Sequence, residues 1–333
     1  MTGDSALSMP HLSAKQVGFK PVVVIVGPTA VGKSRVAVEL AKRYQTEVLT
    51  ADSRQVYRGM DIGTDKPTVE ERQGVVHRLI DLVDPDQAFN AGFFRRHAAA
   101  AIEGLHTEGR LPLVVGGTGL YVRTLLKGIC AAPPADPLVR EQLRHEAQVL
   151  GPDRLYSQLV DIDPESAAKL HPQDISKIIR ALEVHRLSGR PMSAFHEQHR
   201  FSERPYRALV VGLDREREAL YRRIEDRIDW QLAHGFVEET ERLLARGYSR
   251  DSGAMKGLGY RQVAAFLAGE YDRNEMVRRF KRDTRRFAKR QLTWFRSEPE
   301  IQWIRLAESQ TVQDQAEQVA NLIEGFLGSL DHP

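Results

Sequence analysis

The first third of the chain alternates between short apolar runs and amphipathic stretches. Residues 22–26 and 111–115 are continuously apolar, as expected for strands that are buried on both faces of a parallel sheet. Residues 35–44 and 91–106 instead repeat apolar side chains at the spacing of a helix. Further strands are predicted at 47–50 and 78–83. The alternation of strand and helix predicts an α/β fold built on a parallel sheet.

The pattern changes near residue 131. Residues 131–137 form an alanine- and proline-rich linker, and the charged stretches that follow have helical spacing, at 138–150, 153–159, 164–170 and 175–187. A strand pattern returns at 206–213, and the rest is predicted to be helical, at 216–234, 236–246, 260–268, 275–295 and 312–327. We therefore expect a helical insertion domain at 132–202, a core with a helical C-terminal part formed by 21–131 and 203–330, and a flexible tail at 1–20.

One predicted helix is strongly basic, although the net charge of the whole chain is only +3. Residues 273–296 contain ten lysines and arginines, against only Glu275 and Asp283. An apolar stripe recurs on one side of this helix, and we assign it to the core: Met276, Phe280, Phe287 and Trp294. The remaining basic face indicates a polyanionic partner larger than one nucleotide, and a solvated surface without a partner is the alternative.

Composition limits the class of protein. Hydrophobic residues make up 41% of the chain, enough for a sizeable core, and Cys130 is the single cysteine. One cysteine excludes a disulfide framework and any zinc site built on cysteines. The sequence has no secretory-type apolar segment near its start and no apolar run of membrane-spanning length. These features predict a cytoplasmic protein without a membrane partner.

A complete P-loop motif follows the first predicted strand and leads into a helix. It reads Gly27, Pro28, Thr29, Ala30, Val31, Gly32, Lys33 and Ser34. The glycines let backbone N–H groups converge on phosphate oxygens, and Lys33 adds a cation. The hydroxyl of Ser34 is a candidate ligand for Mg²⁺. The motif predicts a P-loop NTPase-like, ATP-binding-like core that holds a polyphosphorylated ligand.

Two further features lie where predicted strands end. Asp52 follows the strand at 47–50, and a glycine-rich turn at 116–121 follows the strand at 111–115. The carboxyl ends of parallel strands face the ligand crevice, so Asp52 is a candidate catalytic residue and the two glycine-rich turns should face each other. The alternative is that Asp52 only caps a helix or a turn.

These groups alone allow two reactions. They would serve a kinase, with Asp52 as the base or as a group that helps to hold the metal. They would equally serve a transfer in which diphosphate leaves. In that case Lys33, Mg²⁺ at Ser34 and the loop amides would stabilise the diphosphate, and Asp52 would accept a proton from the nucleophile.

Several motifs together closely resemble the tRNA dimethylallyltransferases, also called tRNA isopentenyltransferases or the IPP transferase family. They stand in collinear order and comprise residues 27–34, 51–57, 59–67, 115–121, 174–183, 257–262 and 284–295. The chain looks like a bacterial form, without the zinc-finger extension of eukaryotic members. The resemblance implies transfer of the dimethylallyl group from dimethylallyl diphosphate to the N6 amine of the adenosine 3′-adjacent to the anticodon, giving N6-isopentenyladenosine and diphosphate.

The resemblance also implies roles for individual residues. The P-loop would hold the diphosphate of dimethylallyl diphosphate rather than ATP, and the catalytic residues would be Asp52, Thr118 and Lys33. The anticodon stem-loop of tRNA is the implied partner, and its contacts match Asp52, Ser53, Arg54, Gln55, Thr118, Arg140, Ser176, Lys177, Ile178, Ile179, Arg180, Lys256, Gly257, Leu258, Gly259, Tyr260 and Arg261. From the basic helix we add Arg285, Lys289 and Arg290, which together with the insertion would grip the phosphates.

Three rival functions stay open. A small-molecule P-loop kinase would need ATP, a transferase acting on free adenine nucleotides would be inhibited by AMP, and a non-catalytic RNA-binding protein would have no use for Lys33, Ser34 and Asp52 together. The tRNA-modifying enzyme also requires that the target adenine leave its stack to enter the crevice. We expect a monomer.

Overall fold

The computed structural model describes residues 12, 13 and 18–331. The chain divides into two compact units, a core unit of Met1–Leu126 and Pro205–Pro333 and an insertion unit of Lys127–Arg204. The sequence predicts a somewhat shorter insertion, at 132–202. The expected tail at 1–20 lies largely outside the described residues; within it, Leu12 is buried and donates its N–H to the carbonyl oxygen of Gly109 at 2.8 Å.

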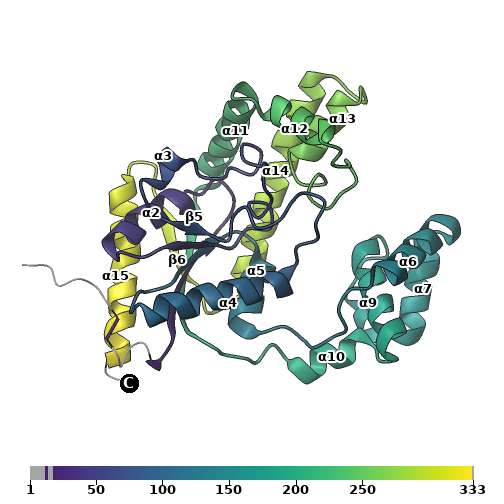
Figure 1. The fold of residues 1–333 in the computed structure, drawn as a ribbon, viewed down its shortest axis with the longest axis horizontal. Coiled ribbons are helices and arrows are strands. Elements are labelled where there is room, and N and C mark those ends of the chain that lie inside the picture. The colour runs from purple at the N-terminus through teal and green to yellow at the C-terminus, as the bar shows by residue number, and fades with distance from the viewer. Residues whose placement is uncertain (1–11, 14–17, 332–333) are drawn as a thin grey trace, which may run out of the picture. The chain divides into compact units, whose positions relative to one another are not determined.

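A six-stranded parallel sheet forms the centre of the core unit (Figure 1), which confirms the predicted fold class. Its strand order is β3-β2-β4-β1-β5-β6, and every neighbouring pair is parallel. The strands are β1 Pro21–Val26, β2 Val48–Thr50, β3 His77–Arg78, β4 Leu113–Gly116, β5 Arg207–Arg215 and β6 Gln302–Leu306.

Helices make up most of the remaining structure. Those of the core unit are α2 Lys33–Arg43, α3 Val69–Arg72, α4 Ala91–Thr107, α5 Gly119–Lys127, α11 Arg217–Ala233, α12 Phe236–Ala245, α13 Tyr260–Leu267, α14 Arg273–Arg296 and α15 Val312–Asp331. Those of the insertion unit are α6 Pro137–Leu150, α7 Pro152–Ile162, α8 Pro164–Ala168, α9 Ile175–Ser188 and α10 Met192–His199.

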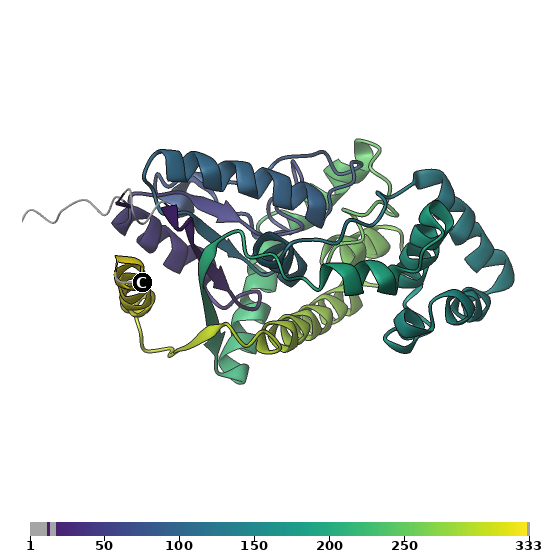
Figure 2. The ribbon, with the colours of Figure 1, turned by 90° about the horizontal axis from the view of Figure 1, so that it is seen from below.

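The central strand β1 is buried along its whole length. Val23 and Ile25 point into one apolar cluster, which includes residues of α2 and α15, and Val22, Val24 and Val26 point into another, which includes residues of α4 and α5. Figure 2 shows α4 on one side of the strands and α15 on the other. Because both faces are covered, the strand reads as an unbroken apolar run.

The insertion unit has its own small core. Leu143 of α6, Leu155 and Leu159 of α7, and Ile178 and Leu182 of α9 are buried together. No strand occurs within Lys127–Arg204, all of which the structure describes. Helix α10 is absent from the sequence-based prediction, and it buries no residue. Without an apolar stripe, its sequence offers no periodic signal.

Two segments of the core differ from the prediction. The sequence predicts a strand over 78–83, but β3 ends at Arg78, because Leu79 and Asp81 have φ angles of 65° and 53° and so leave the extended region. The sequence also predicts that the chain after β5 is wholly helical, but β6 pairs with β5 at the edge of the sheet. In β6 the side chains of Gln302, Trp303 and Arg305 are exposed, so buried and exposed residues do not alternate regularly along this strand. The sequence pattern therefore does not identify it.

The basic helix α14 is amphipathic as predicted, but its buried stripe differs. The buried residues are Met276, Phe280, Thr284, Ala288, Gln291 and Phe295. Phe287 and Trp294 from the predicted stripe are only partly buried. The true stripe follows the 3.6-residue turn, so it passes through small and polar residues that a search for apolar side chains overlooks. Among the described helices, none has the length and apolarity needed to cross a membrane.

Candidate functional site

The P-loop connects the carboxyl end of β1 to the first turn of α2. Gly27 has a φ of 150°, and a Cβ atom there would lie 2.5 Å from the carbonyl oxygen of Leu213, so this position requires glycine. Gly32 precedes α2 and cannot cap it with a side chain, and no acidic residue occupies the first turn. The exposed hydroxyl of Ser34 lies in that turn. The start of α2 is therefore suited to an anion.

Lys33 is held inside the loop. Its Nζ donates hydrogen bonds to the carbonyl oxygens of Gly27 at 3.0 Å and Pro28 at 2.8 Å. Burial lowers the pKa of Lys33 to about 8, although the nearby carboxylate of Asp52 opposes this shift. The lysine is thus a partly desolvated cation close to Asp52, and its charge is not fully compensated.

Three arginines that are distant in sequence also bond to the P-loop. Arg215 of β5 donates to the carbonyl oxygen of Val31 at 2.8 Å, and Arg223 of α11 donates to that of Ala30 at 2.9 Å. Arg227, one turn further along α11, donates to the hydroxyl of Thr29 at 2.7 Å. These three residues are not among those predicted from the sequence. Their only signal is the density of arginine at 215–227, which says nothing about where the side chains point.

The charges of these arginines are incompletely balanced. Burial and then the neighbouring cations Arg35 and Arg227 lower the pKa of Arg223. Asp65 pairs with Arg227 at 2.9 Å, but the Nε of Arg227 is buried and has no hydrogen-bond partner within the described part of the chain. An unpaired buried donor beside a phosphate-binding loop is what an anionic ligand would satisfy.

Asp52 and Thr118 follow neighbouring strands, because Thr50 of β2 pairs with Val115 of β4. The Oδ1 atom of Asp52 accepts the N–H of Arg54 at 2.7 Å and that of Gln55 at 3.3 Å. It closes a turn, and no helix starts there. Asp52 therefore does not cap a helix, but it does close a turn, so its catalytic role stays a prediction beside this structural one.

The hydroxyl oxygen of Thr118 accepts the N–H of Ser53 at 3.0 Å, so the Asp52 turn and the second glycine-rich turn are fastened together. A Cβ atom on Gly117 would lie 3.4 Å from the carbonyl oxygen of Gly27. The two glycine-rich turns therefore adjoin, which confirms the predicted arrangement. Lys33, Asp52 and Thr118 all lie along this edge of the sheet.

Other predicted tRNA-contacting residues of the core gather beside this edge. Arg54 donates to the carbonyl oxygen of Gly253 at 2.6 Å, which brings the Asp52 turn to the segment that contains Lys256. Lys256 and Arg261 are exposed. Tyr260 is only 1% exposed, and its hydroxyl donates to Glu239 at 2.5 Å. The side chain of Tyr260 therefore belongs to the core, and a tRNA contact at this position stays a prediction.

The backbone around Tyr260 is buried as well, at Gly257 and Gly259, whereas Leu258 is partly exposed. A Cβ atom on Gly259 would lie 2.8 Å from the rings of Phe236 and Phe280. These glycines thus serve close packing, and direct contact with a partner is left to their exposed neighbours.

The predicted contacts of the insertion unit divide in the same way. Ser176 and Lys177 are exposed in the first turn of α9, whereas the side chains of Ile178 and Ile179 are buried in the unit's core. A tRNA contact at these four positions stays a prediction. The sequence pattern did not separate the two pairs, because a matching stretch identifies a segment and not the face that each residue presents.

Arg140 and Arg180 have a structural partner in Glu183, whose side chain is fully buried. Arg140 donates to both carboxylate oxygens, at 2.9 and 3.0 Å, and Arg180 donates at 2.6 Å. Burial raises the pKa of Glu183, but these hydrogen bonds outweigh it, and the net pKa is lowered. Both guanidinium groups therefore serve mainly to pair with Glu183 and stabilise the insertion unit.

The three basic residues of α14 that are predicted to bind tRNA differ in whether they form an ion pair. Arg285 is paired with Glu225 of α11. Lys289 and Arg290 are exposed, and no ion pair to either is found within the described residues. Of the three predicted residues, Lys289 and Arg290 thus have the cationic groups best placed to meet a partner.

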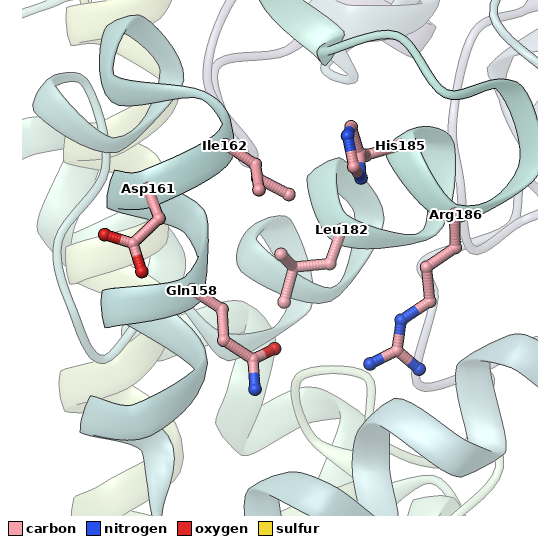
Figure 3. Close-up of a pocket in the computed structure, with 6 residues that line it drawn as sticks. All are labelled: Gln158, Asp161, Ile162, Leu182, His185 and Arg186. Atoms are coloured by element: carbon pink, nitrogen blue, oxygen red, sulfur yellow. The ribbon is translucent and has the colours of Figure 1, made fainter.

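The insertion unit also has a pocket of about 230 Å³. Figure 3 shows the side chains that line it. It is lined by Gln158, Asp161, Ile162, Leu182, His185 and Arg186 of α7 and α9. Arg186 is already paired with Glu146 at 2.8 Å. The pocket has no glycine-rich loop and no helix start, so it offers none of the phosphate-binding features of the P-loop.

Comparisons with known proteins agree with this geometry. The family model of IPP transferase matches residues 55–298. The chain is 51% identical over 289 residues to the tRNA dimethylallyltransferase of Syntrophobacter fumaroxidans, which covers 87% of this chain and 84% of that protein.

Two solved structures are also similar. The full-length tRNA isopentenylpyrophosphate transferase of Bacillus halodurans has a TM-score of 0.71 and 39% identity, over 94% of this chain and 98% of that one. A eukaryotic dimethylallyltransferase acting on tRNA has a TM-score of 0.79 and 28% identity, over 94% of this chain and 80% of that one. The chain therefore belongs to the IPP transferase family.

Proposed function

We propose that this chain transfers the dimethylallyl group of dimethylallyl diphosphate to the N6 amine of the adenosine 3′-adjacent to the anticodon of tRNA. The observation that carries the proposal is the convergence of Lys33 and three arginines on the P-loop, beside the sheet edge that holds Asp52 and Thr118. So much positive charge is suited to a departing diphosphate. The family and the relatives' names support the same reaction.

In this reaction the bond from C1 of the dimethylallyl group to the diphosphate oxygen breaks, and C1 bonds to N6. The diphosphate leaves with the electron pair, and Lys33 and Arg227 would offset its charge. The N6 lone pair is delocalised into the adenine ring, so the amine is a weak nucleophile and stabilising the leaving group matters most. Asp52 would accept the proton that N6 loses, and the hydroxyl of Thr118 would help to orient the amine.

The residues also fit Mg²⁺ as a cofactor. Ser34 offers one hydroxyl at the start of α2, and within the described residues no cluster of three acidic, histidine or cysteine side chains could hold a metal ion alone. Mg²⁺ commonly takes few protein ligands and completes its shell with phosphate oxygens and water. Bound there, the ion would supply further neutralisation of the diphosphate.

For tRNA, we propose that exposed basic residues of both units grip the anticodon stem-loop while the target base turns out of its stack. Lys177, Lys256 and Arg261 are exposed candidates, together with Lys289 and Arg290. We further propose that the enzyme works as a monomer in the cytoplasm, where unmodified tRNA is available.

The test is incubation of the purified protein with labelled dimethylallyl diphosphate and an unmodified tRNA transcript, followed by nucleoside analysis. We expect label in N6-isopentenyladenosine at the position 3′ to the anticodon, with no requirement for ATP. Lys33→Met serves as the inactive control. Dependence on ATP would favour a kinase, and labelling of AMP in place of tRNA would favour a nucleotide prenyltransferase.

A further inference from the structure

Gln291 of α14 lies between the two glycine-rich turns of the site. Its Oε1 atom accepts the N–H of Thr29 in the P-loop at 2.9 Å. Its Nε2 atom donates to the carbonyl oxygen of Gly117 in the second turn, also at 2.9 Å. The residue is only 8% exposed, so both hydrogen bonds are sheltered from water. One side-chain amide thus satisfies a backbone donor of one turn and a backbone acceptor of the other.

The packing around this bridge leaves little freedom. A Cβ atom on Gly117 would lie 2.4 Å from Nε2, so the amide rests directly on the glycine backbone. One turn further along α14, Trp294 covers Gly119, where a Cβ atom would lie 2.2 Å from the indole. The guanidinium of Arg123 lies over the same indole at 4.3 Å from the ring centre. Helix α14 therefore fixes the second turn at two points.

Both bridged residues adjoin candidate reactive groups. Thr29 receives the hydrogen bond from Arg227 through its hydroxyl, and Gly117 precedes Thr118. A change in the separation of the two turns would move the leaving-group site relative to the sheet edge that carries Asp52. Displacements of about 1 Å at such sites cost up to about 100-fold in rate.

We propose that Gln291 is a positioning residue, which sets the spacing between the diphosphate-binding turn and the turn that presents Thr118. This inference rests on the proposed prenyl transfer. Glutamine suits the position because its amide has a donor and an acceptor at opposite corners of one rigid plane. An apolar residue would leave the N–H of Thr29 and the carbonyl of Gly117 without these partners.

The test compares Gln291→Glu, Gln291→Ala and Thr284→Ala. The glutamate keeps an acceptor for Thr29 but removes the donor to Gly117, and the alanine removes both. Thr284 is a matched control, because it lies on the same buried face of α14, is 3% exposed, and its hydroxyl has no partner among the described residues. Each variant is assayed for single-turnover transfer, for affinity toward inorganic diphosphate and toward tRNA, and for thermal unfolding.

We expect both Gln291 variants to lose about 10- to 100-fold in the single-turnover rate, with affinities for diphosphate and tRNA within about twofold of wild type. Thr284→Ala should keep the wild-type rate. A wild-type rate in folded Gln291→Ala, an equal loss in Thr284→Ala, or failure of both Gln291 variants to fold would overturn the proposal. If the wild-type enzyme itself transfers nothing from dimethylallyl diphosphate, the proposed function fails instead.

Discussion

The lowered pKa of Lys33 predicts a specific pH dependence of diphosphate binding. With a pKa of about 8 in the free protein, about nine-tenths of the lysines are charged at pH 7 and about one-tenth at pH 9. A bound diphosphate favours the charged form, so its presence raises the pKa of Lys33. Affinity must then fall as the pH rises through about 8, by about tenfold between pH 7 and pH 9.

The assay is isothermal titration of the wild type, Lys33→Met and Lys33→Arg with inorganic diphosphate at constant ionic strength, from about pH 6.5 to about pH 9.5. Diphosphate titrates too, but the ratio of wild-type to Lys33→Met affinity cancels that effect. We expect this ratio to shrink about tenfold between pH 7 and pH 9. The ratio of Lys33→Arg to Lys33→Met should stay constant, because the guanidinium remains charged.

A wild-type ratio that is flat across this range would refute the reasoning. It would mean either that Lys33 does not meet the diphosphate or that the free lysine is not partly neutral near pH 8. A fall of the same size in the Lys33→Arg ratio would assign the titration to another group.

Three further predictions follow from the other parts of the structure. Asp52→Asn should lower the single-turnover rate about 10²- to 10⁴-fold with little change in either substrate affinity, whereas rescue by excess Mg²⁺ would show that Asp52 organises the metal. Lys289→Ala should reduce the slope of log affinity for tRNA against log salt concentration by about one unit, the value for one phosphate contact. Arg285→Ala should change this slope less, because Arg285 is already paired with Glu225. Equal slopes for the two variants would contradict the proposal that Lys289 contacts tRNA and Arg285 does not. Glu183→Gln should lower the free energy of unfolding by about 2–4 kcal/mol at neutral pH. Because folding lowers the pKa of Glu183, that difference should be full above the ordinary glutamate pKa and should shrink in urea titrations as the pH falls below that pKa and through the lowered folded pKa; a difference that does not change with pH would speak against the ion pairs.

The parts of the site that the sequence predicted are those whose chemistry is local. The P-loop, the Asp52 turn and the second glycine-rich turn each occupy a short segment, and the strand periodicity places all three at one edge of the sheet. Arg227 and Gln291 escaped prediction because they reach the P-loop from α11 and α14, across 198 and 262 residues of sequence. Only the packing of those helices decides which side chain arrives there.

Other features that the sequence did not show have physical causes of the same kind. The side chain of Tyr260 faces the core, where its hydroxyl donates a hydrogen bond to Glu239, which lies 21 residues earlier. The edge strand β6 is half exposed, so its residues alternate too weakly to be recognised. Arg285 carries the same charge as Lys289 in the sequence, and only the position of Glu225 distinguishes the two.

The pairing of β1 constrains the order in which this protein can be made. Strand β1 pairs on one side with β4, through Val23–Val26, and on the other with β5, through Pro21–Val26. During synthesis, the edge of β1 that pairs with β5 therefore stays unpaired until the insertion unit and then β5 have been made. The insertion unit, with its own local core, is able to fold during that interval. The P-loop acquires its contacts with Arg215, Arg223 and Arg227 only after β5 and α11 have been synthesised, so the cationic surroundings of the loop are completed late.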